Sequence, residues 1–373
     1  MRVLVDVTTW APGRSGIGMY TERLLRAYAE AYPSDELLLA SNRPTEADVP
    51  GRAIGPAMPV RALWMQTAMA WHGRRERPDV AFYPNYLGPL LPGAPMVATF
   101  HDMAVYLTPE TFSFRKRELQ RRLLPLVAAR AAAILTPSEA SRRDVIRLLD
   151  VEPRRVVTTP LAADPMFFGP HDADAITAMR ARFALPERYL LAVGTLEPRK
   201  NLVRLVRAFE RIWPQHRDVA LVLVGGKGWR DAAIREALGS SPAREAILTT
   251  GYVEASDLRL LYQGARALCY PSLYEGFGLP VVEAMACGTA TLVSRGSSLD
   301  EVAGDAALAV PAEDEAAIAA AMRELLEDDV LRDRLAARGA ARAATFSWHR
   351  TATLTHDVFE RVARGALPDG SPT

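Results

Sequence analysis

Short apolar runs alternate along the chain with longer segments whose apolar residues recur at helical spacing. This alternation is typical of strand–helix–strand units and predicts parallel sheets covered by helices. In the first half, strands are expected at residues 2–7, 37–40, 80–83, 96–99, 133–135 and 156–158, and helices at residues such as 19–31, 62–73 and 138–149. In the second half, strands are expected at residues 189–193, 220–224, 246–249, 267–270, 291–293 and 307–310, and helices at residues such as 202–212, 255–264 and 280–286. The pattern therefore predicts an α/β fold with two doubly wound, Rossmann-like parallel sheets.

The boundary between the two series is expected at residues 161–175, where Pro, Asp and Gly interrupt both patterns. This divides the chain into domains at residues 1–165 and 166–347, and the tail from residue 348 has a helical pattern again. Ligands of doubly wound sheets bind at the carboxyl ends of the strands. Two facing sheets would bring both sets of strand-end loops to one cleft, where we expect the functional residues.

Composition narrows the function classes. The apolar fraction of 49%, the charged fraction of 24% and the net charge of +1 are those of an ordinary globular protein and argue against nucleic-acid binding. Cys269 and Cys287 form neither a disulfide framework nor a zinc motif, which fits a reducing cytoplasm. From the first residues we expect no signal peptide, and no apolar run has the roughly 18 residues needed to span a bilayer.

The most informative segment is residues 274–283, where Glu275 and Glu283 stand eight positions apart around a glycine-rich turn. A proline then opens a short helix, whose unpaired first-turn amides favour an anion such as phosphate. Gly276 and Gly278 leave the backbone accessible to a ligand. With Glu283 expected in the first helical turn, both carboxylates would face one pocket and accept hydrogen bonds from sugar hydroxyls. Alternatively, the segment is only an acid-capped helix start, and taken alone it does not decide between the two.

Two further strand-end segments have phosphate-binding chemistry. Arg199 and Lys200 follow a predicted strand and precede a helix, where a guanidinium and an ammonium suit a diphosphate. The alternative is a solvated basic turn, which is the commoner environment of an isolated Arg-Lys pair. Residues 225–228 form a glycine turn after another strand, which fits either close approach to a nucleotide or a plain strand-to-helix connection.

Three signals are weaker. Gly16 and Gly18 follow the first strand but lack the third glycine of a dinucleotide-binding fingerprint, so we read them as a close-approach loop rather than as a dehydrogenase motif. His101 ends a strand and either bonds a substrate hydroxyl or is held by local backbone. The pair Asp172 and Asp174 lies in the linker instead of after an apolar strand, so we read it as a turn and expect no metal site.

Basic segments raise the hypothesis of contact with an anionic membrane. Residues 112–117 lead to Arg121 and Arg122, and Trp64, Ala68 and Trp71 share one predicted helical face before Arg74, Arg75 and Arg77. Each cation near anionic headgroups contributes on the order of 1 kcal/mol. The alternative is a buried tryptophan stripe beside a solvated basic face.

Taken together, these motifs resemble the retaining glycosyltransferases of family 4, which have the two-domain GT-B fold. The resemblance covers nearly the whole chain. Within the family, the chain looks most similar to bacterial mannosyltransferases of surface polysaccharide assembly. The segments that carry it are Ser15-Gly16-Ile17-Gly18, Phe100-His101-Asp102, residues 135–138, residues 194–201, the Glu-x7-Glu segment from Glu275 to Glu283, residues 294–302 and Phe346-Ser347-Trp348.

The resemblance implies that the second domain binds a nucleotide diphosphate sugar. Arg199 and Lys200 would hold its diphosphate, Tyr252 and Val253 would flank the base, and Glu283 would bind the ribose hydroxyls. These residues constitute the expected donor site.

The resemblance also implies contacts to the reacting groups. Glu275, with the backbone of Gly276, Phe277, Gly278 and Leu279, would meet the donor sugar and the distal phosphate. In the first, acceptor-side domain, Gly16 and Gly18 would approach the donor phosphates and His101 would contact the transferred sugar. The tail helix, residues 348–373, would pack back on that domain. The catalytic set is then Glu275, His101, Lys200 and Arg199.

Charge development supports this reading. Breaking the glycosyl–phosphate bond builds negative charge on the leaving diphosphate, which fixed cations and helix-end amides stabilise. We therefore expect no metal and no cofactor, with the acceptor hydroxyl attacking from the leaving-group face. The expected reaction moves mannose from GDP-mannose to a lipid-linked or oligosaccharide acceptor, in the cytoplasm or peripherally at the inner face of the membrane. An epimerase or hydrolase of nucleotide sugars, and a silent sugar-binding partner, are the alternatives.

Overall fold

The structure is a computed structural model of the chain, and it describes residues 1–10, 16–43, 49–55, 58, 60–228 and 230–366. It divides into two compact units. Unit 1 comprises Met1–Tyr106, Phe112–Leu161 and Ser347–Thr373, and unit 2 comprises Leu107–Thr111 and Ala162–Phe346. The last helix of the chain therefore belongs to unit 1, although it follows unit 2 in sequence.

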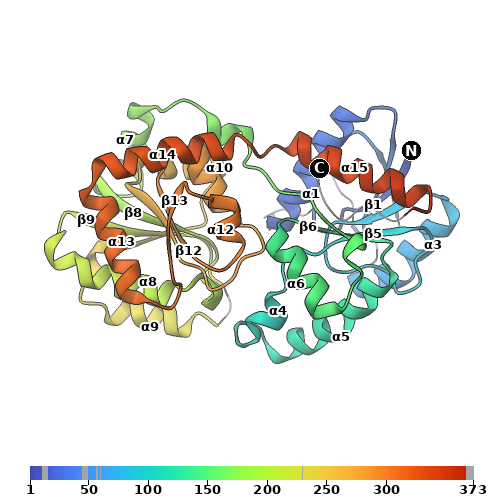
Figure 1. Ribbon diagram of the computed structural model, residues 1–373, viewed down its shortest axis with the longest axis horizontal. Coiled ribbons are helices and arrows are strands. Elements are labelled where there is room, and N and C mark those ends of the chain that lie inside the picture. Colours follow the sequence, from blue (N-terminus) through green and yellow to red (C-terminus); the bar gives the residue numbers. More distant parts are fainter. Residues whose placement is uncertain (11–15, 44–48, 56–57, 59, 229, 367–373) are drawn as a thin grey trace. The chain divides into compact units, whose positions relative to one another are not determined.

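Unit 1 is built on a parallel sheet whose strands, within the described residues, are ordered β3-β2-β1-β4-β5-β6-β7 (Figure 1). The strands are β1 (Arg2–Asp6), β2 (Glu36–Ala40), β3 (Arg52–Ile54), β4 (Val80–Tyr83), β5 (Met96–Thr99), β6 (Ala133–Thr136) and β7 (Val156–Thr158). Apart from β3 they match the predicted strands, because burial on both faces makes their apolar runs continuous. Strand β3 was missed because it is a short, exposed edge strand without an apolar signal.

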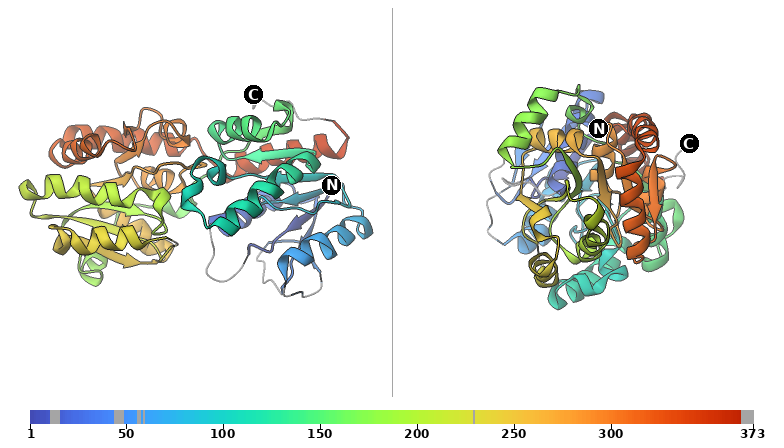
Figure 2. Two further views of the ribbon diagram at one scale, coloured as in Figure 1. Left: turned by 90° about the horizontal axis from the view of Figure 1, so that it is seen from below. Right: turned by 90° about the vertical axis from the view of Figure 1, so that its left-hand side faces the viewer.

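Helices cover the sheet of unit 1, and the tail helix is one of them. They are α1 (Gly16–Ala31), α2 (Arg61–Gln66), α3 (Ala68–Arg75), α4 (Ala104–Leu107), α5 (Phe114–Arg130), α6 (Glu139–Leu149) and α15 (Trp348–Ala363). Helix α15 packs along α1 and against β4 and β6. Helix α5 forms a layer outside the strands, as the teal helix in Figure 2 shows, and Ser138 caps α6 by accepting from Ser141 N at 3.0 Å.

The single helix predicted at residues 62–73 is wrong, because the chain breaks at Thr67 into α2 and α3. Thr67 has φ −112° and ψ −75°, which is not regular helical backbone. The break separates the two tryptophans predicted to share a face. Trp64 is fully buried, whereas Trp71 is 48% exposed and lies under the Arg75 guanidinium. A tryptophan stripe on one surface is therefore excluded.

Unit 2 repeats the architecture with a parallel sheet whose strands, in the part of the chain described, are ordered β10-β9-β8-β11-β12-β13. The strands are β8 (Arg188–Val193), β9 (Val219–Val224), β10 (Ile247–Gly251), β11 (Ala267–Tyr270), β12 (Thr291–Ser294) and β13 (Ala307–Val310). All six were predicted to within two residues. Leu221 of β9, Phe209 and Ile318 are among the fully buried side chains that form the core on one side of this sheet.

The helices of unit 2 lie on both sides of its sheet (Figure 1). They are α7 (Ala173–Arg182), α8 (Leu202–Ile212), α9 (Ala232–Ser240), α10 (Ala255–Gly264), α11 (Leu279–Ala286), α12 (Ser298–Ala303), α13 (Glu315–Glu327) and α14 (Asp329–Ala343). Helix α7 begins inside the predicted linker, so the interpretation of Asp172 and Asp174 as a turn is wrong. Asp172 is the N-cap of α7, accepting from Ala175 N at 2.9 Å, and Asp174 lies in the first turn.

Candidate active site

The strand order of unit 2 creates a switch point between β8 and β11. From β8 the chain continues to β9 on one side, and it later returns to β11 on the other side. Loops after two such neighbouring strands diverge and leave room for a ligand at the carboxyl edge of the sheet. The predicted residues Lys200 and Glu275 lie in these two loops.

The structure brings three of the predicted catalytic residues into direct contact. Lys200 Nζ donates to Glu275 Oε1 at 2.7 Å, and Arg199 Nη1 donates to Glu275 Oε2 at 2.6 Å. Each oxygen of Glu275 therefore accepts from a different cation. Arg199 also donates through Nη2 to Glu197 Oε1 at 2.8 Å, and Lys200 donates to the Tyr270 hydroxyl at 2.5 Å.

Backbone and side-chain hydrogen bonds hold the loop after β8 against the loop after β11. Residues Pro198–Lys200 form a single 3₁₀ turn that ends at Asn201, whose left-handed φ of 60° is tolerated by asparagine. Asn201 is buried and donates through Nδ2 to Pro271 O at 2.9 Å. Leu273 N donates to Arg199 O at 2.9 Å. The loop after β8 is thus fastened to the loop after β11 before any ligand binds.

Burial and charge act in opposite directions on this cluster. Burial alone would raise the pKa of Glu275, but the positive charges of Arg199 and Lys200 outweigh it and hold the pKa at about 2. Burial lowers the pKa of Lys200, and the Glu275 carboxylate offsets this only in part. Glu275 is therefore a firmly ionised carboxylate, unsuited to act as a general acid at neutral pH.

Two glycines of this region have clear steric reasons. Gly278 has φ 103°, and a Cβ added there would lie 2.3 Å from Leu299 Cδ2. Gly225, in the glycine turn after β9, has φ 149°, and an added Cβ would lie 2.0 Å from Gly194 O. The turn at residues 225–228 therefore packs against the loop after β8, which accounts for its glycine without a nucleotide.

Helix α11 begins at Leu279, so Gly276 and Phe277 precede it and Glu283 is not in its first turn as predicted. Glu283 lies one turn further along and is 5% exposed. It accepts from the Tyr262 hydroxyl at 3.0 Å. Burial raises the pKa of Glu283 to about 7, against the lowering effect of that hydrogen bond. The two glutamates of the motif thus occupy opposite electrostatic environments.

Tyr252 and Val253 follow β10, which is the edge strand of the sheet and is separated from β8 by β9. Tyr252 is 69% exposed and Val253 is half-buried. The structure therefore places this pair at the rim of the strand-end edge, apart from the Lys200–Glu275 contact. An exposed aromatic ring at such a rim is available for stacking on a planar ligand.

In unit 1, His101 follows β5 and contacts a backbone carbonyl, but that of a residue 17 positions earlier and not of its own loop. Its Nε2 lies 2.8 Å from Pro84 O, and its ring packs edge-on to Tyr20 with centroids 4.8 Å apart. Burial lowers the pKa of His101, so the neutral imidazole is favoured. Gly16 and Gly18 lie in the first turn of α1 instead of in a loop, and Ser15 is outside the described residues.

Several residues of the cluster were missed by sequence reasoning. Glu197 is 2% exposed and Tyr270 3%, and both partner the predicted cations. Ser298 donates from Oγ to Glu275 O at 2.8 Å, and Tyr262 partners Glu283. Glu197 adjoins the Arg-Lys pair in sequence and Tyr270 ends a predicted strand, so position alone offered a signal for these two. Ser298 lies in the segment 294–302 that carries the family resemblance, but no role was assigned to it, and Tyr262 offered no signal.

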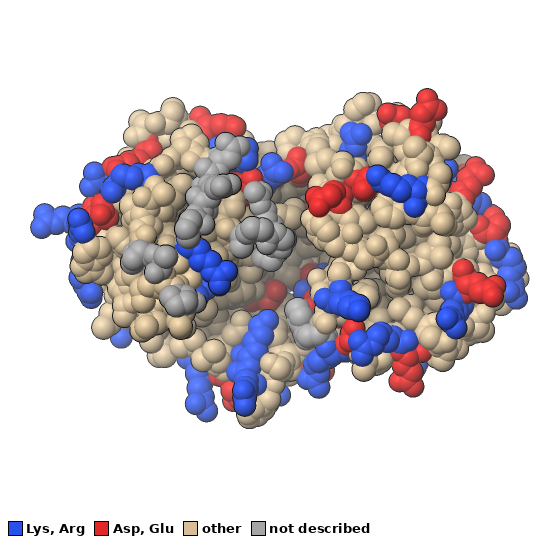
Figure 3. All heavy atoms as spheres, turned by 180° about the vertical axis from the view of Figure 1, so that it is seen from behind, with Lys and Arg blue, Asp and Glu red and all other residues tan. Residues whose placement is uncertain are grey.

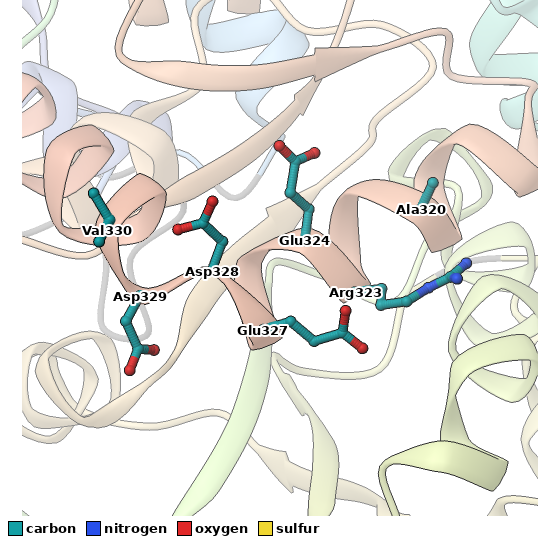
Figure 4. Close-up of a pocket in the computed structure, with 7 residues that line it drawn as sticks. All are labelled: Ala320, Arg323, Glu324, Glu327, Asp328, Asp329 and Val330. Carbon is teal, nitrogen blue, oxygen red and sulfur yellow. The ribbon is translucent and has the colours of Figure 1, made fainter.

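A separate surface hollow of about 630 Å³ lies at the junction of α13 and α14 (Figure 4). Its lining includes Glu324, Glu327, Asp328 and Asp329, whose carboxylates would repel a diphosphate. Among the described residues, His, Cys, Asp and Glu side chains form no group of three that could hold a metal ion. The switch point of unit 2 therefore remains the candidate site for an anionic ligand.

Comparisons with known proteins show the family of the chain. The family described as Glycosyltransferase Family 4 matches residues 14–167, and the family described as Glycosyl transferases group 1 matches residues 177–342. The O-antigen chain mannosyltransferase B of Escherichia coli is 32% identical over 366 residues, which cover 93% of this chain and 96% of that protein. The chain belongs to the family 4 glycosyltransferases. Within that family it is an enzyme with the GT-B fold.

Other relatives support the same assignment. The MMP alpha-(1->4)-mannosyltransferase of Mycolicibacterium hassiacum is 32% identical, with 81% of this chain and 75% of that protein covered. The sucrose-phosphate synthase of Thermosynechococcus elongatus superposes with a TM-score of 0.77 at 20% identity, over 98% of this chain and 100% of that chain. The Anabaena protein Alr3699/HepE, solved in complex with UDP-glucose, gives 0.74 at 18% identity over 98% and 100%. At these identities the two structures bear on the fold alone. None of the described helices is long and apolar enough to cross a bilayer.

Proposed function

We propose that this glycosyltransferase transfers mannose from GDP-mannose to a lipid-linked or oligosaccharide acceptor in surface polysaccharide synthesis. The observation that carries the proposal is the near full-length similarity to the O-antigen chain mannosyltransferase of Escherichia coli. The fold neighbour solved in complex with UDP-glucose supports a nucleotide-sugar donor. The contact of Lys200 and Arg199 with Glu275 supplies the matching chemistry.

The donor diphosphate binds at the switch point of unit 2. Lys200 has three N–H donors, and the contacts described here use two of them, on Glu275 and Tyr270. The third is directed to a donor phosphate, and the Arg199 guanidinium adds its positive charge. Amides of the segment from Gly276 to Leu279, at the start of α11, complete the anion site.

The remaining predicted residues surround the rest of the donor. Glu283 binds the ribose hydroxyls, while Tyr252 and Val253 flank the base at the rim of the sheet. Glu275 and His101 contact the transferred sugar. Gly16 and Gly18 bring the backbone of α1 close to the phosphates.

The reaction proceeds with retention of configuration. The bond between the anomeric carbon and the phosphate oxygen breaks, and the leaving diphosphate takes the electron pair. Lys200 and Arg199 stabilise its charge, and an enzyme that supplies two cations in this way does not require a metal ion for that task. The acceptor hydroxyl forms the new bond from the same face and passes its proton to the departing phosphate.

Two measurements test the proposal. A thermal-shift screen of nucleotide sugars should give the largest increase in melting temperature with GDP-mannose, because a ligand that binds only the native state stabilises it. Incubation of the donor with an acceptor should then release GDP and form a glycoside. Conversion of the free nucleotide sugar at full rate without acceptor would instead identify an epimerase or a hydrolase.

We also propose that the enzyme works in the cytoplasm and contacts the inner face of the membrane through α5. On this helix Arg115, Leu119, Arg122 and Leu126 recur at three- and four-residue spacing and share an exposed face. Phe114 is 69% exposed, Leu119 59% and Leu126 49%. Apolar side chains among cations are the composition of a helix that lies in an anionic lipid surface. On the face that Figure 3 shows, basic and acidic side chains both occur, and basic ones predominate along its lower edge.

Flotation with phosphatidylglycerol vesicles tests this contact, with phosphatidylcholine vesicles for comparison. The protein should float only with the anionic vesicles, and Leu119→Ser should reduce the bound fraction. Val330→Ser is the matched control, because Val330 is 77% exposed on α14 of unit 2. Equal flotation of the wild type with both kinds of vesicle would contradict the contact. Equal flotation of Leu119→Ser and Val330→Ser with the anionic vesicles would also contradict it.

A further inference from the structure

The sheet of unit 1 has a switch point of its own, between β1 and β4. Strand β1 lies between β2 and β4 just as β8 lies between β9 and β11. Asp6 is the last residue of β1, and Tyr83 is the last residue of β4. Burial is the main cause of the raised pKa of the Tyr83 hydroxyl, and the charge of Asp6 adds to it. The motifs singled out in the sequence include neither Asp6 nor Tyr83.

Asp6 is fully buried, yet only half of its carboxylate is engaged. Oδ1 accepts from Thr8 N at 3.0 Å. Oδ2 lies 3.6 Å from Arg61 Nη2, which is an ion pair but too long for a hydrogen bond, and it has no other partner among the described residues.

The groups around Oδ2 are also incompletely satisfied. Arg61 Nε, Arg61 Nη2 and Thr8 Oγ1 are each buried without a hydrogen-bond partner within the part of the chain described. Buried polar atoms in folded proteins are nearly always hydrogen-bonded, so a cluster of four at one strand end calls for an explanation. A ligand bound at the end of β1 could supply the hydrogen-bond partners that these four atoms lack.

The charges define what such a ligand is. A carboxylate only accepts hydrogen bonds and a guanidinium only donates them, so together they match a hydroxyl group, which does both. A phosphate would be repelled by Asp6, and a metal cation would be repelled by Arg61. Adjacent hydroxyls of a sugar ring satisfy Asp6, Arg61 and the Thr8 hydroxyl at once.

Access to the pair is from the side of Arg61. Its side chain is 37% exposed, whereas Asp6 is covered. No described hydrogen bond fixes the buried nitrogens of the guanidinium. A change of its rotamer would therefore lengthen the 3.6 Å ion pair with Asp6 but break no hydrogen bond of these nitrogens that the structure shows.

We propose that Asp6 and Arg61 bind the hydroxyls of the acceptor sugar and determine which glycan the enzyme extends. That this sugar is an acceptor rests on the proposed function, whereas the binding of a sugar by unit 1 does not. The pair is a specificity-determining element of unit 1, separate from the diphosphate-binding chemistry of unit 2.

Saturation-transfer NMR with the full chain tests the proposal, using methyl α-mannoside, methyl α-glucoside and methyl α-galactoside as probes. The wild type should bind at least one of them. Asp6→Asn and Arg61→Gln should each weaken that binding by about tenfold, the loss expected for a hydrogen bond to a charged group. Arg154→Gln should leave it unchanged, because Arg154 is an exposed arginine ion-paired with Glu152 before the start of β7.

Absence of saturation transfer to all three glycosides, or equal binding by wild type, Asp6→Asn and Arg61→Gln, would overturn the proposal. Folding of each variant is checked by the thermal shift that GDP-mannose produces through unit 2. If Asp6→Asn does not fold, the partly exposed Arg61→Gln still decides the outcome. Glycoside binding that depends on Arg61 in a protein that does not transfer mannose would remove the proposed function and leave the sugar site standing.

Discussion

The two units share the order of their first six strands but differ in whether the charged side chains at the switch point are hydrogen-bonded to one another. In unit 2, Lys200 and Arg199 each donate to Glu275, so these charges are paired in the absence of a ligand. In unit 1, Asp6 and Arg61 lie just beyond hydrogen-bond distance and leave buried atoms unsatisfied among the described residues. The difference teaches that the doubly wound fold supplies the location of a site, whereas its side chains decide the ligand.

A second contrast lies within unit 2, between the glutamates of one motif. Two cations hold the pKa of Glu275 at about 2, whereas burial raises the pKa of Glu283, which accepts from a tyrosine hydroxyl, to about 7. Sequence spacing alone assigned both to the same task. The predictions below are designed to break or sharpen these contrasts.

The largest expected effect is that of Glu275→Gln on stability. Removing the carboxylate leaves two buried cations without their shared partner, which should lower the free energy of unfolding at pH 7 by about 3–5 kcal/mol. Because the folded pKa of Glu275 is lowered to about 2, its contribution is present above the unfolded value of 4.5 and is lost as pH falls from 4.5 toward 2. Urea unfolding across this pH range measures both quantities.

The matched control for this measurement is Glu236→Gln, which changes an exposed glutamate of α9. It should leave both the free energy of unfolding and its acid dependence unchanged. A wild-type protein and a Glu275→Gln variant with parallel acid-unfolding curves would show that the cations do not stabilise this carboxylate.

Lys200→Ala should reduce the transfer rate by about 10²–10³-fold, the range seen when one fixed donor to a developing anion is removed. The effect should fall mainly on kcat, because the charge on the leaving diphosphate grows in the transition state. Steady-state kinetics measure it, and circular dichroism checks the fold. Arg235→Ala removes an exposed cation paired with Asp231 and should retain full activity. An active Lys200→Ala enzyme would end the assignment of unit 2 as the donor site.

Glu283 should show the opposite pH dependence to Glu275. Its folded pKa is raised to about 7 from 4.5, so the folded state holds the proton more tightly than the unfolded state does. Stability from this group is therefore lost as pH rises from 4.5 to 7, by about 3 kcal/mol at most. Comparison of wild type with Glu283→Gln across this range isolates the contribution, since the variant cannot ionise. Coincident pH profiles would place Glu283 in an ordinary solvated environment.

The smallest expected effect is that of chelation. Because Lys200 and Arg199 carry the charge that stabilises the diphosphate, prior treatment with EDTA should leave the transfer rate unchanged. The measurement is the initial rate before and after EDTA, with and without added Mg²⁺. A loss of activity that Mg²⁺ restores would show that the two cations do not suffice.

Much of the fold was predictable because both sheets are parallel and buried on both faces. Strands such as Val80–Tyr83 and Ala267–Tyr270 are uninterrupted apolar runs, which can be recognised directly in the sequence. Strand Arg52–Ile54 was not predictable, since an exposed edge strand has no such run. The break at Thr67 was also hidden, because nothing in the local pattern interrupts the helical spacing.

By itself, the sequence determined the α/β class and the two series of strands, and it singled out Lys200, Arg199 and Glu275 as candidate site residues. These follow from local patterns and from residue types that occur together along the chain. Only the tertiary structure decided which partners those residues have. Tyr262 beside Glu283 and Arg61 beside Asp6 are pairs distant in sequence, and side-chain burial and charge balance depend on such distant neighbours. The pKa contrast between Glu275 and Glu283 therefore arises from packing, which no local pattern records.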